Sequence, residues 1–486
     1  MAQKIIIDPV TRIEGHLKIE AEVDGGKVIE ARSSGSLFRG IELILQGRDP
    51  RDAQHFVMRI CGVCPISHAT ASAMALDSAF GLEVPDNGRI IRNLIYGANF
   101  IHSHLLHFYA LAALDYVDVV RAGLAVPPFM PRYEVAGEYR LPDALNKAAA
   151  EQYVQALDMR KKAHEMLAIW GGRAPHPQAI VPGGVTEIVD AQKVIEYAYR
   201  LKELRSFVEN VYVPTVQKVA ELYSDYLEVG VGCKNMLAYG GFPQSAADPQ
   251  GADGFFKRGA YIQGKDVVMS PNLITEEVKY SWYNDDTGGS KHPDESVITP
   301  NPQKPGAYSW LKAPRYDGHP MEVGPLARMW VGKNQAVRSL GDKAFSVMGR
   351  HFARAVECLE LTKIMEQWLL QLQPGKPVCV PHIIPKEADG IGLTEGPRGA
   401  LGHWIKIEKG LTSKYNAVVP TTWNAAPKDD KGQRGPIEEA LVGTTVKDPK
   451  NPIELVRIVR AFDPCLGCAI HLMTPDKKVL SEYRIN

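Results

Sequence analysis

The sequence predicts an α+β fold that is predominantly helical: a single large domain with a central bundle of long helices, an N-terminal β-hairpin and peripheral short strands. Three observations predict it. Stretches with helical periodicity dominate the chain, strict alternation of apolar and polar residues is confined to a segment near the N-terminus, and neither an internal repeat nor a flexible linker divides the 486 residues. A chain of this length can bury a large core without disulfide bonds.

The individual elements follow from local pattern. Residues 16–31 alternate apolar and polar side chains around Asp24-Gly25-Gly26, which predicts the hairpin. Helices are predicted over 69–80, 90–120, 142–170, 190–229 and 340–372. Between 240 and 325 the composition shifts to Gly, Pro, Asp and Ser, so we expect short strands at best there. The segment 378–452 carries β-like runs at 404–408 and 415–419.

Composition and charge exclude several classes of protein. Apolar residues make up 45% and charged residues 23%, as in ordinary soluble globular proteins. Lys plus Arg and Asp plus Glu number 56 each, so no basic field attracts nucleic acid. The start of the chain lacks the pattern of a secretory signal. The most hydrophobic window, 93–114, contains three histidines, which suits a buried helix better than a transmembrane segment.

The spacing of the cysteines is more informative than their number. Seven cysteines are too few for a disulfide scaffold. Cys61 and Cys64 form one C-x-x-C pair, and Cys465 and Cys468 form another. Each pair can present two thiolates to one metal, so together the pairs make a four-thiolate site. The remaining cysteines are predicted to be small buried residues: Cys233, Cys358 and Cys379.

Spacing alone leaves two interpretations of this site: zinc held by four cysteines, or thiols for disulfide exchange. The distance between the pairs counts against zinc. Structural zinc ribbons place their two pairs close together in sequence, whereas these pairs lie at opposite ends of the chain. A site that ties both ends together suits a buried catalytic centre better than a small structural site.

The cysteine pairs and their neighbours resemble the paired signatures of nickel-iron hydrogenase large subunits. The first reads Arg59-x-Cys61-Gly-x-Cys64-x-x-x-His68, and the second reads Asp463-Pro-Cys465-x-x-Cys468-x-x-His471. Further motifs extend the resemblance over essentially the whole chain: Arg12-Ile-Glu14-Gly-His16, Phe38-Arg-Gly-Ile-Glu42, Ser103-His104-x-x-His107-Phe-Tyr109, Gly396-Pro397-Arg398-Gly-Ala400, Trp423-Asn424 and Gly435-Pro-Ile-Glu-Glu439.

The resemblance implies a nickel-iron centre whose iron carries carbon monoxide and two cyanides. It implies that Cys61 and Cys465 bind nickel terminally, while Cys64 and Cys468 bridge nickel to iron. Soft, polarizable thiolates suit these metals and support redox chemistry.

Other residues match the surroundings of that centre. Arg398 and Thr421, with Pro397 and Pro420 beside them, match the positions that hydrogen-bond the cyanides. A fixed guanidinium is a strong donor to a cyanide nitrogen and contributes positive potential, so Arg398 is also expected to be catalytic. His68 is expected to orient the thiolates rather than to bind metal.

Two carboxylates have predicted roles. Glu14 matches the family's proton-gate glutamate beside Cys465, where a carboxylate one hydrogen bond away can relay a proton. Without the motif, Glu14 at the end of a strand would be interpreted as a surface charge. Glu42, the carbonyl of Ala417 and His471 match a Mg²⁺ site of mostly hard ligands.

Three positions concern the branch of the family. Ser103 stands where standard members carry Asp and where the nickel-iron-selenium branch carries Ser, and Gly467 also favours that branch. Cys465 is a cysteine where that branch usually has selenocysteine. The chain is either a cysteine-bearing relative of that branch or a sequence in which a recoded residue is written as Cys.

These features predict the catalytic subunit of a hydrogenase, interconverting molecular hydrogen with protons and electrons. No further cysteine cluster is left to hold an iron-sulfur centre, so the predicted partner is an iron-sulfur small subunit. The alternatives are a non-catalytic hydrogen sensor built on the same centre and a zinc-stabilised structural protein. Quinone-binding respiratory relatives are disfavoured because they lack both cysteine pairs.

The resemblance also implies maturation and location. Residues 1–471 would form the catalytic domain, and 472–486 would be an extension that a maturation protease removes after nickel-insertion proteins have acted. Loss of the tail would let His471 settle around magnesium; composition alone would favour an ordinary exposed tail. We expect a periplasmic protein exported with its small subunit, or otherwise a cytoplasmic one.

Overall fold

The computed structural model describes residues 2–126, 129–130 and 132–469. Residues 468 and 469 are described by their backbone alone. The α-helices are α1 (Ile41–Leu45), α2 (Asp52–Val57), α3 (Pro65–Phe80), α4 (Asp86–Leu105), α5 (Asp143–Gly171), α6 (Ala191–Phe207), α7 (Val213–Leu222), α8 (Pro325–Val331), α9 (Gln335–Arg338), α10 (Val347–Gln371), α11 (Pro420–Asn424), α12 (Pro436–Leu441), α13 (Ile453–Ala461) and α14 (Leu466–Ala469). The strands are β1 (Gln3–Ile7), β2 (Leu17–Asp24), β3 (Lys27–Gly35), β4 (Ile180–Val181), β5 (Gly184–Val185), β6 (Met236–Gly241), β7 (Phe256–Ile262), β8 (Lys265–Val267), β9 (Ile274–Glu277), β10 (Ala313–Tyr316), β11 (Glu387–Gly396), β12 (Gly399–Glu408) and β13 (Leu411–Val418).

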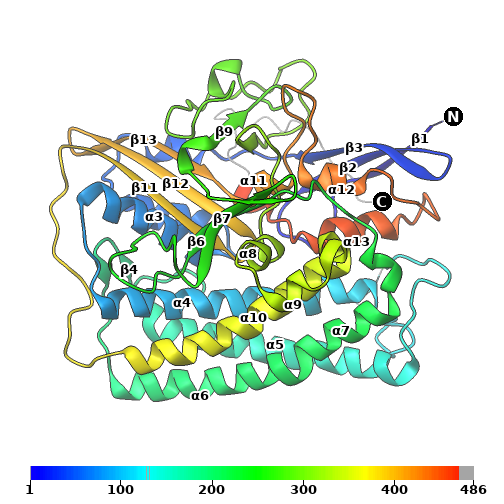
Figure 1. Cartoon of the computed structure of the whole chain (residues 1–486), viewed down its shortest axis with the longest axis horizontal. Helices are drawn as coiled ribbons and strands as arrows, with labels where there is room; N and C mark the ends of the chain where they lie inside the picture. The colour runs from blue at the N-terminus through cyan, green and yellow to red at the C-terminus, as the bar shows by residue number, and fades with distance from the viewer. Residues whose placement is uncertain (1, 127–128, 131, 470–486) are drawn as a thin grey trace.

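The long helices form one layer of the molecule, as predicted. Helix α5 packs against α4 and α6, and α10 packs against α4, α6 and α7, so the four longest helices run side by side (Figure 1). Trp170 of α5 and Trp368 of α10 are among the largest fully buried side chains of this layer. Cys358 of α10 is buried as predicted, whereas Cys233 and Cys379 are partly exposed. Within the described part of the chain, no helix is both long and apolar enough to cross a membrane.

Two of the predicted helices contain π-helical turns. The predicted helix 90–120 is α-helical only as far as Leu105, continues as a π-helix at Leu106–Ala112 and a 3-10 turn at Ala113–Asp115, and ends there, so the prediction is wrong for 116–120. The predicted helix 190–229 becomes α6 and α7 joined by a second π-helix, Val208–Tyr212. A π-turn keeps the helical hydrogen-bond pattern with one extra residue per turn, which periodicity alone does not reveal.

A three-stranded antiparallel sheet, β11-β12-β13, packs against the side of α3 that faces away from the long helices. Strands β11 and β12 are ten residues each, longer than the short strands expected for this segment, and both contact α3 (Figure 1). The contact depends on glycine, because a Cβ atom at Gly392 would lie 2.0 Å from the carbonyl oxygen of Ala71 in α3. This packing fixes the start of α3 relative to the turn between β11 and β12.

We expect Gly392→Ala to destabilise the protein by about 1–3 kcal/mol, because the added methyl group must push β11 away from the α3 backbone. Thermal unfolding of the purified protein measures the loss. Asp389→Ala, at an exposed position on the same strand, serves as the control and should change the unfolding temperature little. Equal unfolding temperatures for both variants would contradict the close packing.

The N-terminal hairpin is confirmed and gains a third strand. β2 and β3 pair antiparallel, and β1, which alternation did not predict, pairs with β2 through contacts such as Ile5 opposite Ala21. The loop between β1 and β2 then reaches across to the C-terminal part of the chain, where the backbone of Glu14 forms an isolated parallel bridge with Cys465. Both ends of the chain therefore meet at one place.

Candidate active site

Three of the four predicted cysteines converge in the interior. Cys61 follows a short 3-10 turn, Cys64 is the residue preceding α3, and Cys465 directly precedes α14. The Sγ atom of Cys465 lies 3.3 Å from that of Cys61 and 4.0 Å from that of Cys64. All three thiols are buried and lie within 4.8 Å of one another. The fold therefore builds one thiol cluster from the two ends of the chain.

The structure describes only the backbone of the fourth cysteine. Cys468 lies in α14, within one turn of Cys465, but its side chain is outside the described residues. His471 and the predicted extension 472–486 also lie outside them. Their predicted roles stay predictions.

The loop around Cys61 favours its thiolate form. The backbone N–H groups of Val63 and Cys64 point to the Cys61 sulfur, with N to Sγ distances of 3.3 and 3.4 Å. Cys64 itself precedes the first turn of α3, where Pro65 occupies a position whose N–H would have no helical partner. Backbone N–H groups and a helix N-terminus both stabilise negative charge on sulfur.

Glu14 lies against the third thiol. Its Oε2 atom is 3.1 Å from the Cys465 sulfur and accepts a hydrogen bond of 2.6 Å from the backbone N–H of Gly467. Its carbonyl accepts from the backbone of Leu466 at 2.8 Å. A Cβ atom at position 467 would lie 2.3 Å from the Glu14 carboxylate, so a larger residue there would displace this carboxylate from its present position. The structure thus places the Glu14 carboxylate directly beside Cys465.

The surroundings of Glu14 favour a carboxyl group that can hold a proton. Burial raises its pKa, and the negative charge of Cys61 raises it further. The hydrogen bonds from Cys465 and Gly467, together with the charge of Arg398, act in the opposite direction. The net shift is upward, away from the value of a solvated glutamate.

Arg398 lies in the two-residue turn between β11 and β12 and is buried. One of its terminal nitrogens forms an ion pair of 3.0 Å with Asp463, and the other lies 3.5 Å from the hydroxyl of Ser103. Burial alone would lower its pKa, but Asp463 and the neighbouring cysteines hold that pKa well above its ordinary value. Its buried Nε atom has no hydrogen-bond partner among the described residues, which leaves a charged donor for a further group.

The remaining residues predicted near the metals are all buried. Pro397 shares the turn with Arg398, and Pro420 opens α11. The hydroxyl of Thr421 accepts a hydrogen bond of 2.9 Å from the backbone N–H of Cys465, so α11 holds the backbone of this cysteine in place.

His68 lies on α3, one turn after Cys64. Its Nδ1 atom is 3.2 Å from Nε2 of His403, and Nδ1 of His403 is 2.7 Å from the hydroxyl of Tyr415. Burial lowers the pKa of His68 to about 4, so its ring is neutral near pH 7. This chain of hydrogen-bonding groups fixes the ring relative to the sheet.

Glu42 and Ala417, two of the predicted magnesium ligands, line the same small cavity. The cavity measures about 20 Å³, room for one water molecule or ion. Glu276 and Lys312 also line it and form an ion pair of 2.8 Å. Burial raises the pKa of Glu42 to about 7, a shift that a bound cation would reverse.

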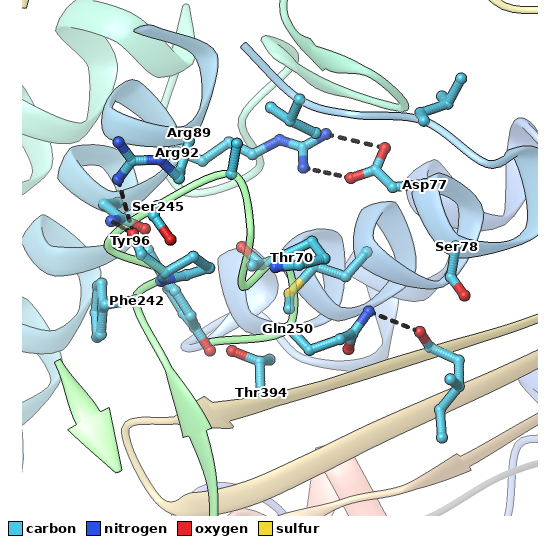
Figure 2. Close-up of a pocket in the computed structure, with 18 residues that line it drawn as sticks. Thr70, Asp77, Ser78, Arg89, Arg92, Tyr96, Phe242, Ser245, Gln250 and Thr394 are labelled. Carbon is cyan, nitrogen blue, oxygen red and sulfur yellow. Dashed lines mark hydrogen bonds and ion pairs between the residues drawn. The ribbon is translucent and has the colours of Figure 1, made fainter. Parts of the chain in front are cut away.

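A larger cavity of about 220 Å³ lies further along α3. Figure 2 shows it between α3, α4 and the sheet, with the ion pair of Asp77 and Arg92 at one end and Tyr96 at the other. Tyr96 also donates a hydrogen bond to the carbonyl of Glu395, three residues before Arg398. Tyr96 thus joins the wall of this cavity to the end of β11, where the Arg398 turn begins.

Sequence reasoning missed several partners of the site. Asp463 stands inside the Asp-Pro-Cys motif, so the motif could have revealed it as a partner for a cation. Lys312, Glu276 and His403 have no such signal, because each stands in a segment whose pattern indicates only a strand or a loop.

Comparison with known proteins identifies the family. A family model described as nickel-dependent hydrogenase matches residues 39–127 and 124–471, and a shorter one, described as HoxL-like, matches residues 4–34. The chain belongs to the nickel-dependent hydrogenase large-subunit family. It is accordingly an enzyme of this family, and the resemblance inferred from the motifs is confirmed.

Individual relatives of this hydrogenase subunit agree over its whole length. The periplasmic NiFeSe hydrogenase large subunit of Desulfomicrobium baculatum is 49% identical, over 97% of this chain and 95% of the relative. The uptake hydrogenase large subunit of Bradyrhizobium diazoefficiens is 36% identical, over 99% and 97%. The solved Ni-Fe-Se hydrogenase of Desulfovibrio vulgaris Hildenborough, in its as-isolated oxidized state, has a TM-score of 0.93 and 48% identity, covering 97% of this chain and 100% of that one. The similarity to the nickel-iron-selenium branch is confirmed, and the cluster accommodates cysteine at position 465.

Proposed function

We propose that this hydrogenase chain is the catalytic subunit of a heterodimer that reversibly splits molecular hydrogen into two protons and two electrons. The observation that carries the proposal is the buried cluster of Cys61, Cys64 and Cys465 beside the carboxylate of Glu14. When bound, a nickel-iron centre supplies the redox-active metals at which the hydrogen molecule is cleaved. The chain supplies the thiolates, the proton acceptor and the dry surroundings.

The donor set fits such a centre. Three buried thiols within 4.8 Å of one another are soft ligands close enough to share two metals. Cys61 and Cys465 would bind nickel terminally, and Cys64 and Cys468 would bridge nickel to iron. The Nδ1 atom of the neutral His68 ring is 3.2 Å from His403, and this contact would orient the start of the helix that Cys64 precedes.

The turn of Arg398 fits the carbon monoxide and cyanide ligands of the iron. The buried Nε atom of Arg398 needs an acceptor that the described residues do not provide, and a cyanide nitrogen is such an acceptor. Thr421 keeps a hydroxyl hydrogen free to donate, because its oxygen accepts from Cys465. Pro397 and Pro420 contribute apolar walls that exclude water.

Glu14 would carry the proton away from the metals. Its carboxylate is one hydrogen bond from the Cys465 sulfur, and burial shifts its pKa toward values at which it can accept and release a proton. Its own loop reaches the surface, since Gly15 and His16 are exposed. The proton therefore has a short route out of the interior.

Magnesium would occupy the cavity of Glu42 and Ala417. The cavity offers a buried carboxylate and room for a small ion. His471 would complete the ligand set after processing, so a mature chain ends at His471. The segment 472–486 would be removed by a maturation protease once nickel-insertion proteins have loaded the site.

An iron-sulfur small subunit would accept the electrons. Among the described residues, the only group of three or more possible metal ligands is the thiol cluster, and the cysteines outside the two pairs are not part of it. The face beside Glu14 suits a partner, because the exposed His16 lies next to the segment with Leu37, whose side chain is 50% exposed.

Since the relative from Desulfomicrobium baculatum is named periplasmic, the heterodimer would work in the periplasm, which cell fractionation tests.

Metal analysis of the purified heterodimer tests the proposal. We expect nickel and iron in equal amounts in the large subunit, infrared bands from bound carbon monoxide and cyanide, and rapid hydrogen oxidation with an artificial dye as acceptor. Zinc alone without these bands would overturn the proposal in favour of a structural site. The full metal centre with negligible turnover would instead indicate a hydrogen sensor.

Intact-mass measurement of the active, nickel-loaded protein tests the processing. We expect the mass of a chain that ends at His471. A chain that still ends at Asn486 would contradict the processing and the role of His471 as a magnesium ligand, but would leave the thiol cluster unaffected.

A further inference from the structure

Arg328 is a buried arginine of α8 that no motif singled out. Its side chain is only 1% exposed, and the rings of Phe100 and Phe256 lie over its guanidinium with centroids 5.3 and 5.0 Å away. A fully buried cation is costly unless all its donors are satisfied and its charge is balanced. The hydrogen-bond partners of the Arg328 guanidinium therefore indicate the role of this residue.

Each of the five N–H donors of Arg328 has a partner. Nε and one terminal nitrogen hold the two carboxylate oxygens of Glu357 at 2.7 and 2.6 Å. The other terminal nitrogen donates to the carboxylate of Glu395 at 2.8 Å. The last two hydrogen bonds go to backbone carbonyls, that of Gly396 at 2.8 Å and that of Pro397 at 3.0 Å.

These two carbonyls belong to the residues directly before Arg398. Gly396 ends β11, and Pro397 and Arg398 form the two-residue turn to β12. The carbonyl one residue earlier, that of Glu395, accepts from Tyr96, whose ring lies beside Thr394 in Figure 2. Three successive carbonyls thus have fixed, buried donors. Gly399, directly after the turn, packs closely against Val323: a Cβ atom at position 399 would lie 2.5 Å from the Val323 side chain.

Glu357 anchors Arg328 to a second element. It lies on α10, and its Oε1 atom is also 2.9 Å from Nε2 of His104 on α4. Burial would raise the pKa of Glu357, but the charge of Arg328 lowers it below its ordinary value, so the pair is ionised. Helices α4, α8 and α10 therefore hold one guanidinium, and that guanidinium holds the turn.

We propose that Arg328 is the positioning residue that places Arg398 over the thiol cluster. The inference rests on the proposed function, in which Arg398 donates to a cyanide of the iron. All five donors of Arg328 are engaged by protein groups, so none is left for a ligand of the metals. Arg328 fixes the backbone from which Arg398 extends, and Arg398 has few other constraints: the ion pair with Asp463 and a contact of 3.5 Å with Ser103.

Arg328→Lys in the assembled heterodimer tests this placement. Lysine keeps the charge but has three N–H donors on one nitrogen, too few to replace the five hydrogen bonds that Arg328 makes to Glu357, Glu395 and the two carbonyls. In a crystal structure we expect the Arg398 guanidinium to be displaced relative to Cys465. We expect shifted infrared cyanide bands and a turnover reduced roughly 10- to 100-fold.

Arg315→Lys is the matched control. Arg315 is also 1% exposed, pairs with the carboxylate of Asp429 at 2.7 Å, and donates to the carbonyls of Pro314 and Gln433 at 2.8 and 3.0 Å. Its hydrogen bonds to the described residues go to Asp429, Pro314 and Gln433, outside the Arg398 turn. We expect this variant to keep the wild-type cyanide bands.

The outcomes separate this inference from the proposed function. A wild-type protein without cyanide bands would refute the function, and the position of Arg398 in the two crystal structures would still test Arg328. Wild-type bands and an unmoved Arg398 in Arg328→Lys would overturn the inference. If Arg328→Lys does not fold, Glu357→Gln replaces it as the test, because the N–H group of its amide would face one of the two Arg328 donors that now bind the carboxylate. Unchanged cyanide bands in Glu357→Gln would likewise overturn the inference.

Discussion

Cys64→Ser is expected to yield a folded protein that carries almost no nickel or iron. The hydroxyl of serine is smaller than a thiol and scarcely ionises near pH 7, so it is a poor ligand for metals that prefer soft sulfur. As a bridging ligand, Cys64 would contribute a bond to each metal, and its loss leaves both metals incompletely bound. Nickel and iron content per folded molecule, measured by elemental analysis, should fall to near zero. Cys468→Ser should act in the same way.

Cys358→Ser provides the control for this loss. Cys358 is completely buried in α10, so the change introduces the same buried hydroxyl outside the thiol cluster. We expect it to lower the unfolding temperature somewhat while the metal content stays at the wild-type level. Full nickel content in Cys64→Ser would show that Cys64 is not a ligand. Loss of metal in both variants would point to general destabilisation instead.

The fold was predictable where local pattern and local geometry agree. Alternation identified the hairpin, and the predicted helix 190–229 begins at Asp190, whose side chain accepts from two backbone N–H groups at the start of α6. Strand β11 escaped prediction because Gly390 and Gly392 resemble loop residues, although the close approach of α3 requires them. Such glycines can be distinguished only when the packing partner is known.

The site was predictable to the extent that its residues stand in motifs. The two cysteine pairs indicated a shared metal site without any structure, but local spacing could not show that Glu14 lies beside Cys465, since a backbone bridge between distant segments brings them together. Arg328 had no signal at all. Its partners come from α10 and the end of β11, and only the folded chain assembles them.

Glu14→Gln is expected to leave the metal centre assembled and to reduce turnover by about 10²- to 10⁴-fold. The amide has nearly the same shape, and its oxygen can still accept the hydrogen bond from Gly467. It cannot, however, take up and release a proton at neutral pH. Metal content and the infrared bands should therefore match the wild type, while hydrogen oxidation and the exchange of hydrogen with deuterated water are both nearly lost.

The exchange reaction makes this prediction specific to proton transfer. Exchange needs a proton to leave the site but no electron to reach the partner subunit, so a defect in electron transfer would spare it. Glu20→Gln, on the adjoining strand β2 and paired only with surface lysines, removes a carboxylate outside the site and should keep wild-type turnover and exchange. If Glu14→Gln exchanges hydrogen at the wild-type rate, protons leave by another route, and the short contact between Glu14 and Cys465 serves only to hold the two ends of the chain together.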